Sequence, residues 1–162
     1  MLLVAAPGVQ GAYSRTALVV VPGTGGHAGF ILNRSRDAKL ASVLPGDPLS
    51  ATSSAPVRFG GPLGSKVVFA MVRHDPGEGA KRLFGDVFMT TGAKTLERIV
   101  EQAPQDARFF AGMVVWLPGE LESEIESGDW IVTYPDAAMV FHRDPEAMWG
   151  ELIGREGKTA LK

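Results

Sequence analysis

Short apolar runs, separated by turns rich in glycine and proline, occur along most of the chain. The runs that predict strands are residues 2–6, 17–21, 29–33, 57–59, 66–73, 86–90, 107–116, 130–133 and 138–142. The glycine loop between the second and third runs predicts a β-hairpin, and Pro135 with Asp136 predicts another between the last two. Few polar residues interrupt 107–116, which predicts a central strand.

Four other segments carry helix signals. One follows the i, i+3, i+4, i+7 spacing of a single helix face, with Leu96, Ile99, Val100 and Ala103. This spacing predicts a helix from residue 91 or 92 to about 103. Residues 37–44 predict a short helix, and residues 118–128, which begin with proline and end with glycine, predict another. Asp144 predicts the N-cap of a last helix that ends at Gly154.

The predicted strands outnumber the predicted helices and come in hairpin-like groups rather than in a βαβ rhythm. We therefore predict an α+β fold, a single compact domain with a mixed, largely antiparallel sheet rolled toward a barrel and three to four short helices. The domain is expected to span residues 1–154, with 155–162 as a frayed C-terminal tail. Residues 46–56, rich in proline, serine and small residues, are expected to form a mobile surface loop.

The composition excludes several classes of protein. The chain has 162 residues, 45% of them hydrophobic and 21% charged, which suffices for a core without metal or disulfide staples. Cysteine is absent, which excludes thiolate nucleophiles and cysteine-ligated metals. A net charge of -2 argues mildly against strong binding to a phosphate backbone. Because neither a signal peptide nor a membrane span is evident, we expect a cytoplasmic protein without a membrane partner.

Two motifs suggest ligands, and each has a simpler reading. The loop residues Gly23 to Ala28 match G-x-G-x-x-A, but the apolar residues after them predict a strand, whereas a dinucleotide site needs a helix there. A flexible hairpin tip is therefore favoured, and no cofactor is expected. The glutamates at 120, 122, 124 and 126 could hold a divalent cation. Acidic side chains also complement a helix dipole, so a solvated helix face is favoured and no metal is expected.

Histidines offer the main route to catalysis. None of the three forms an i, i+4 pair, but His74 and His142 lie at predicted strand ends beside carboxylates, which could orient a general base. Neither Ser14 nor Ser35 lies in a nucleophile elbow, so no catalytic residue is assigned. The missing catalytic constellation favours a non-enzymatic protein, with an unrecognised hydrolase using a strand-end histidine as the alternative.

Arginines gather at the ends of the first predicted hairpin. Tyr13 and Arg15 precede one strand, Asn33 and Arg34 follow the next, and Arg58 lies on a third. If the hairpin places them together, they form one basic surface suited to an acidic partner or a phosphate. These five residues are the candidate interaction surface, although the interpretation as separate solvated arginines is favoured.

An ordered set of short motifs makes the chain similar to the AlgH/YqgE family of small bacterial proteins. The motifs are residues 3–7, 13–16, 29–34, 59–62 and 116–122 leading to Gly128, Asp129 and Trp130. Their order and spacing extend from about residue 2 to 153. The glycine loop at 23–27 departs from the acidic residues usual in relatives, so no loop function is carried over.

The resemblance implies a compact single-domain α+β fold with barrel-like strands and a cytoplasmic bacterial protein. Family members are often labelled candidate transcriptional regulators, and the family offers no catalytic residues to carry over. We therefore expect a protein of unestablished activity that acts through contact with an unknown protein partner. Weak association with nucleic acid is a further alternative, although no helix-turn-helix is evident.

Overall fold

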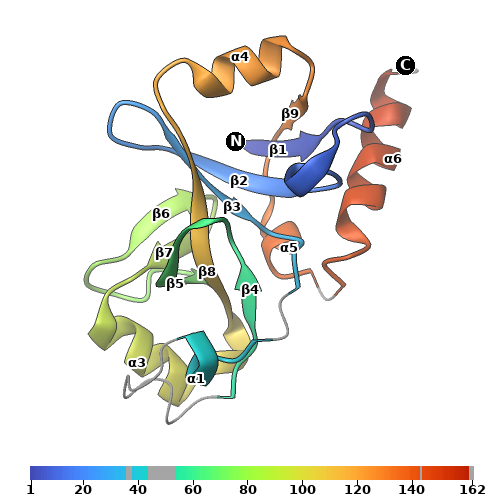
Figure 1. Ribbon diagram of the computed structural model, residues 1–162. Coiled ribbons are helices and arrows are strands. Elements are labelled where there is room, and N and C mark those ends of the chain that lie inside the picture. The colour runs from blue at the N-terminus through green and yellow to red at the C-terminus, as the bar shows by residue number, and fades with distance from the viewer. Residues whose placement is uncertain (36–37, 44–53, 143, 161–162) are drawn as a thin grey trace.

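The computed structural model describes residues 1–35, 38–43, 54–142 and 144–160, and Figure 1 shows their arrangement. The strands are β1 (Leu2–Ala5), β2 (Ala17–Pro22), β3 (His27–Ile31), β4 (Val57–Phe59), β5 (Leu63–Arg73), β6 (Lys81–Phe84), β7 (Val87–Thr90), β8 (Ala107–Trp116) and β9 (Trp130–Thr133). The helices are α1 (Leu40–Val43), α3 (Ala93–Gln102), α4 (Glu120–Glu126), α5 (Ala137–Val140) and α6 (Met148–Ala160), with 3-10 turns η1 (Gly11–Tyr13) and η2 (Pro104–Asp106).

The nine strands form one sheet in the order β6-β7-β5-β8-β3-β2-β1-β9, with β4 also paired to β8. The β4–β8 pair is parallel, and the other strand pairs described are antiparallel. The predicted α+β class with a mixed, largely antiparallel sheet is therefore confirmed. Among the described residues, no helix is both long and apolar enough to cross a membrane.

Much of the sheet is buried on both faces. Leu2 and Val4 of β1 join the hydrophobic cluster that α5 and α6 cover, whereas Leu3 and Ala5 join the cluster beneath α4. In the other half of the sheet, Phe69 of β5 joins the first cluster, whereas the adjacent Val68 and Ala70 pack with α3 in a third cluster. Burial on both faces explains why the strands read as continuous apolar runs rather than as alternating ones.

Strand β8 connects the two halves of the sheet. Its first half pairs with β5 and β4, and its last three residues pair with β3. Gly112 lies between these two parts of β8 and has φ +79°. The side chains before and after Gly112 do not follow one continuous alternation between the two faces of the sheet. Ala111 lies in the α3 cluster and Val114 in the α4 cluster, while Met113 packs on the opposite face. The register of β8 with β5 is also irregular here, because Met113 pairs with Leu63 but Ala111 pairs with Val68.

Two predictions at the C-terminal end are wrong. The predicted strand 138–142 is instead helix α5, because the Asp136 side chain accepts a hydrogen bond from the Met139 N–H at 3.2 Å and caps it. The last helix does not end at Gly154 but continues through Ala160, since an exposed glycine inside a helix costs only about 1 kcal/mol. Asp144 does cap the turn before α6, accepting from the N–H of Glu146 at 3.1 Å.

Strand β6 was not predicted, because only Leu83 and Phe84 are apolar in that segment. The ends of β4, β8 and β9 match the predicted 57–59, 107–116 and 130–133, and the predicted hairpin is the β2–β3 pair. Apart from 138–142, the other predicted strands and helices are present with shifted ends. Residues 46–53 of the mobile loop predicted at 46–56 lie outside the described residues.

Candidate functional site

The structure brings three of the five candidate surface residues together. Arg15 lies in the connection that enters β2, and Asn33 and Arg34 follow β3, the antiparallel partner of β2. With Ser14, Ser35 and Glu146, they line a hollow of about 400 Å³. The hairpin therefore places both arginine-bearing segments at the same end of the sheet.

Asn33 holds the two segments in register. Its side chain is almost fully buried, its Oδ1 accepts from the Ala17 N–H at 2.9 Å, and its Nδ2 donates to the Arg15 carbonyl at 2.8 Å. Arg34 adds a hydrogen bond from its guanidinium to the Ser14 carbonyl at 2.5 Å. Because a buried amide must satisfy its donors and acceptors, Asn33 fixes the path of the backbone beside both arginines.

Arg15 is held in an unusual conformation. Its φ is +56°, in the left-handed region that non-glycine residues seldom adopt. Its guanidinium lies over the ring of Trp149, 4.9 Å from the ring centroid, and the Trp149 indole donates to the Ala5 carbonyl at 2.8 Å. Helix α6 therefore positions the Arg15 side chain at the hollow. Backbone conformations of this kind persist where surrounding contacts determine them, often at binding sites.

Tyr13 and Arg58 lie apart from this hollow. The Tyr13 ring packs edge-on against Trp130, with centroids 6.2 Å apart. Arg58 donates to the carbonyls of Leu32 and His142 and so joins β4 to the segment after α5. Burial, followed by repulsion from a second arginine, lowers the pKa of Arg58 to about 10. The candidate interaction surface itself stays a prediction, now divided between separate places.

The histidines of the hydrolase alternative are placed differently. His142 is bonded through both ring nitrogens, with Nε2 2.9 Å from a Glu151 oxygen and Nδ1 accepting from the Asp144 N–H at 3.0 Å. It thereby joins the segment after α5 to α6. His74 is exposed and has φ +65°. In the described part of the chain, neither histidine is hydrogen-bonded to a serine or threonine hydroxyl, and no three metal-ligating side chains gather.

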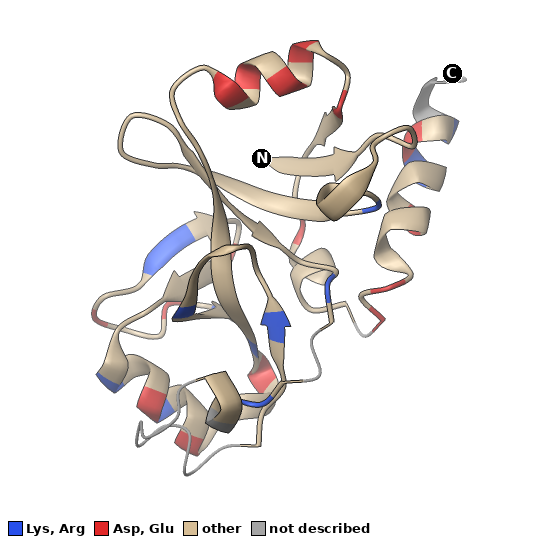
Figure 2. Cartoon of the chain, in the orientation of Figure 1, with Lys and Arg blue, Asp and Glu red and all other residues tan. Residues whose placement is uncertain are grey.

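The sequence interpretation missed an arrangement beneath α4. Figure 2 shows that this helix carries acidic residues and no basic ones. Glu124 is half-buried, and its Oε2 accepts hydrogen bonds from the indole N–H groups of Trp116 at 2.9 Å and Trp130 at 2.7 Å. The solvated-face interpretation is therefore wrong for Glu124. The available signal was its position three residues after the buried Leu121, on the inward side of the helix.

Tyr13 is expected to titrate above the ordinary tyrosine pKa of about 10. Burial, and then the negative charge of Glu124, raises the pKa of Tyr13. A Tyr134→Phe variant leaves Tyr13 as the only tyrosine, so the ultraviolet absorbance of tyrosinate reports its ionisation alone. Adding Glu124→Gln should lower the midpoint of the Tyr13 titration only in part, because burial contributes more to the raised pKa than Glu124 does.

The same shift predicts a dependence of stability on pH. Because the folded-state pKa of Tyr13 is raised, its contribution is fully present below the unfolded-state pKa and is lost as pH rises through the folded-state value. A midpoint at or below the ordinary value in the Tyr134→Phe protein would show that Tyr13 is not packed beneath α4.

A family model and individual relatives match this chain over most of its length. A family model described as AlgH-like matches residues 2–160. A UPF0301 protein of Chlorobium limicola is 30% identical over 162 residues, covering 97% of this chain and 85% of the relative. A UPF0301 protein of Methylococcus capsulatus is 29% identical over 144 residues, covering 86% of this chain and 79% of the relative. The similarity therefore extends over nearly the whole chain.

Two solved structures share the fold. The AlgH protein of Pseudomonas aeruginosa matches with a TM-score of 0.79 at 22% identity, covering 96% of this chain and 87% of that one. A protein of Corynebacterium diphtheriae matches with a TM-score of 0.76 at 26% identity, covering 95% of this chain and 84% of that one. The likenesses confirm the predicted fold class, and the family match confirms the resemblance stated from the motifs. The chain belongs to the AlgH-like family.

Proposed function

We propose that this protein is a cytoplasmic, non-enzymatic binding protein that engages an acidic segment of a partner protein through the hollow at Arg15 and Arg34. The observation that carries the proposal is that two arginines from separate segments line one polar hollow beside the buried Asn33. Arginine suits this role, because its planar guanidinium presents paired donors to a carboxylate.

The charges around the hollow support an anionic partner. Among the residues that the structure describes, neither Arg15 nor Arg34 forms an ion pair with a carboxylate, and Glu146 is the one acidic residue of the lining. One terminal guanidinium nitrogen of Arg34 donates a hydrogen bond to the Ser14 carbonyl, and the other guanidinium N–H groups can donate to a ligand. Both arginines are held by the fold before binding, which reduces the entropy lost on association.

A regulatory role would act through this contact and needs no reading of DNA bases. The histidine alternative has less support, because His142 is bonded through both ring nitrogens to neighbouring residues of the fold. A nucleic-acid partner also has less support, because a net charge of -2 does not favour binding to a phosphate backbone. Both alternatives remain distinguishable from the proposal by experiment.

Arg15→Asn is expected to weaken binding of a glutamate-rich peptide at least about tenfold, the effect of losing one charged hydrogen bond. Asparagine tolerates the left-handed backbone at this position, so the fold should be retained. Arginine side-chain N–H resonances and the Trp149 indole resonance would report the titration. Lys158→Gln removes a positive charge from the last turn of α6, away from the hollow, and should change the affinity less than about twofold.

Two results would overturn the proposal. One is a peptide titration that leaves the Arg15, Arg34 and Trp149 signals unmoved at low salt. The other is equal weakening by Lys158→Gln and Arg15→Asn, which would indicate general charge attraction. If a DNA duplex binds with a steep salt dependence while the peptide does not, the nucleic-acid alternative replaces the proposal.

A further inference from the structure

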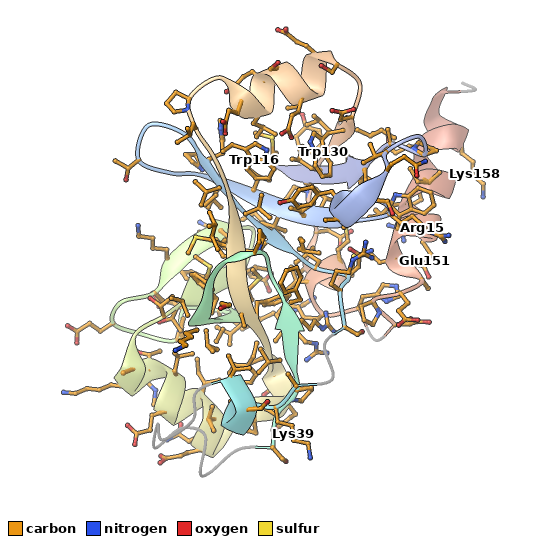
Figure 3. The ribbon with its side chains drawn as sticks, viewed as in Figure 1. Arg15, Lys39, Trp116, Trp130, Glu151 and Lys158 are labelled. Carbon is orange, nitrogen blue, oxygen red and sulfur yellow. The ribbon has the colours of Figure 1, made fainter. Side chains whose placement is uncertain are left out.

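A second hollow, of about 590 Å³, lies between α4 and the end of β8. Figure 3 shows the labelled Trp116 and Trp130 side by side beneath α4. Tyr13 completes an aromatic wall with these two tryptophans, and the acidic residues of the lining are Glu120 and Glu124. Lysine, arginine and histidine are absent from the described lining, so the hollow has an acidic and aromatic character.

The acidic groups are held in place by hydrogen bonds. One carboxylate oxygen of Glu124 accepts hydrogen bonds from both indole N–H groups. Its other oxygen has no hydrogen-bond partner among the described residues. Glu120 accepts from the Leu117 N–H at 2.7 Å through one oxygen. Each carboxylate therefore keeps a fixed position and acceptor capacity for a ligand. The raised pKa of Tyr13, caused partly by Glu124, agrees with this proximity.

We propose that this hollow binds an organic cation, an alkylammonium or guanidinium group. Aromatic rings attract such cations through their negative faces, and a carboxylate adds a charged hydrogen bond. Glu124 is oriented by two indoles before any ligand arrives, so a cation would meet an already ordered carboxylate. An anion would be repelled by both carboxylates, and an uncharged apolar ligand would leave them unpaired. This site is separate from the arginine hollow, which has a different lining.

The cation could be a small molecule or the side chain of a lysine or arginine in a partner protein. Titrations with methylammonium, with N-acetyl-arginine amide and with a short arginine-containing peptide distinguish these sources. The indole N–H resonances of Trp116 and Trp130 are expected to shift saturably, because both bond to Glu124. Trp149 bonds instead to the Ala5 carbonyl and serves as an internal control. A response to methylammonium indicates a free ligand, and a response only to the two arginine-containing probes indicates a protein side chain.

Matched charge removals test the assignment. Glu124→Gln keeps an oxygen that can accept from the indoles but removes the charge, and it should weaken cation binding about tenfold. Glu126→Gln makes the same change on the same helix at a residue outside the hollow, and it should change binding less than about twofold. If Glu124→Gln fails to fold, Glu120→Gln removes the other carboxylate of the lining and should also weaken binding.

Three results would overturn the inference. The first is the absence of any shift at Trp116 and Trp130 with all three cations. The second is a shift that sodium chloride at the same ionic strength reproduces. The third is equal weakening by Glu126→Gln and Glu124→Gln, which would indicate a diffuse acidic surface on α4. Because the peptide with glutamates tests the arginine hollow independently, failure of one site leaves the other proposal standing.

Discussion

Gly112→Ala is expected to lower the free energy of unfolding by about 4 kcal/mol, combining the cost of a left-handed non-glycine residue with that of over-packing. Gly112 has φ +79°, and a Cβ added there would overlap the carbonyl oxygen of Gly61. Relaxation is restricted, because a Cβ at Gly60 or Gly61 would likewise collide with the backbone of β8. Gly60 also donates to the Ala111 carbonyl at 2.8 Å and accepts from the Ile31 N–H at 2.9 Å.

Urea denaturation of Gly112→Ala and Gly128→Ala would separate the two contributions. Gly128 has a similar φ of +83°, but an added Cβ there would meet nothing within 4 Å. Gly128→Ala should therefore cost only the conformational part, about 1–2 kcal/mol. Equal losses in the two variants would contradict the close approach of β8 to the segment at Gly60 and Gly61.

The path of β8 shows how much of the fold the sequence could predict. The ends of the strand were predictable, because the apolar run from 107 to 116 is bounded by polar and turn residues. The shift at Gly112 was not, because both faces of the strand are buried and no polar alternation marks the change of face. Helix α5 was missed for a related reason. Its short apolar segment reads as a strand, and only the cap at Asp136 distinguishes the two.

The arginine hollow was partly predictable, because a hairpin must bring the residues before one strand and after the next to the same end. Arg15, Asn33 and Arg34 obey this rule. Tyr13 precedes Arg15 by only two residues, yet the backbone is left-handed at Arg15 and the Tyr13 ring packs against Trp130. Arg58 instead donates to the carbonyl of His142, which follows α5, a helix that the sequence pattern did not indicate. Contacts with residues distant in the sequence therefore determine where the Tyr13 and Arg58 side chains lie.

Glu124→Met is expected to destabilise the protein by about 3 kcal/mol, because a buried donor left without a partner costs about 1–3 kcal/mol and two indoles lose theirs. Trp116 and Trp130 are 4% and 7% exposed, so solvent can replace the lost acceptor only in part. Methionine keeps a similar length and suits a helix, which isolates the loss of the acceptor from changes in packing or helix propensity. Urea denaturation, followed by the fluorescence of the tryptophans, would measure the change.

Glu124→Gln is the comparison that separates hydrogen bonding from charge. Its amide oxygen can accept from both indoles, so its free energy of unfolding should stay within about 1 kcal/mol of the parent protein. Glu126→Met, at an exposed position of the same helix, should change stability by less than about 0.5 kcal/mol. If Glu124→Gln were as unstable as Glu124→Met, the negative charge rather than the shared acceptor would hold the tryptophans.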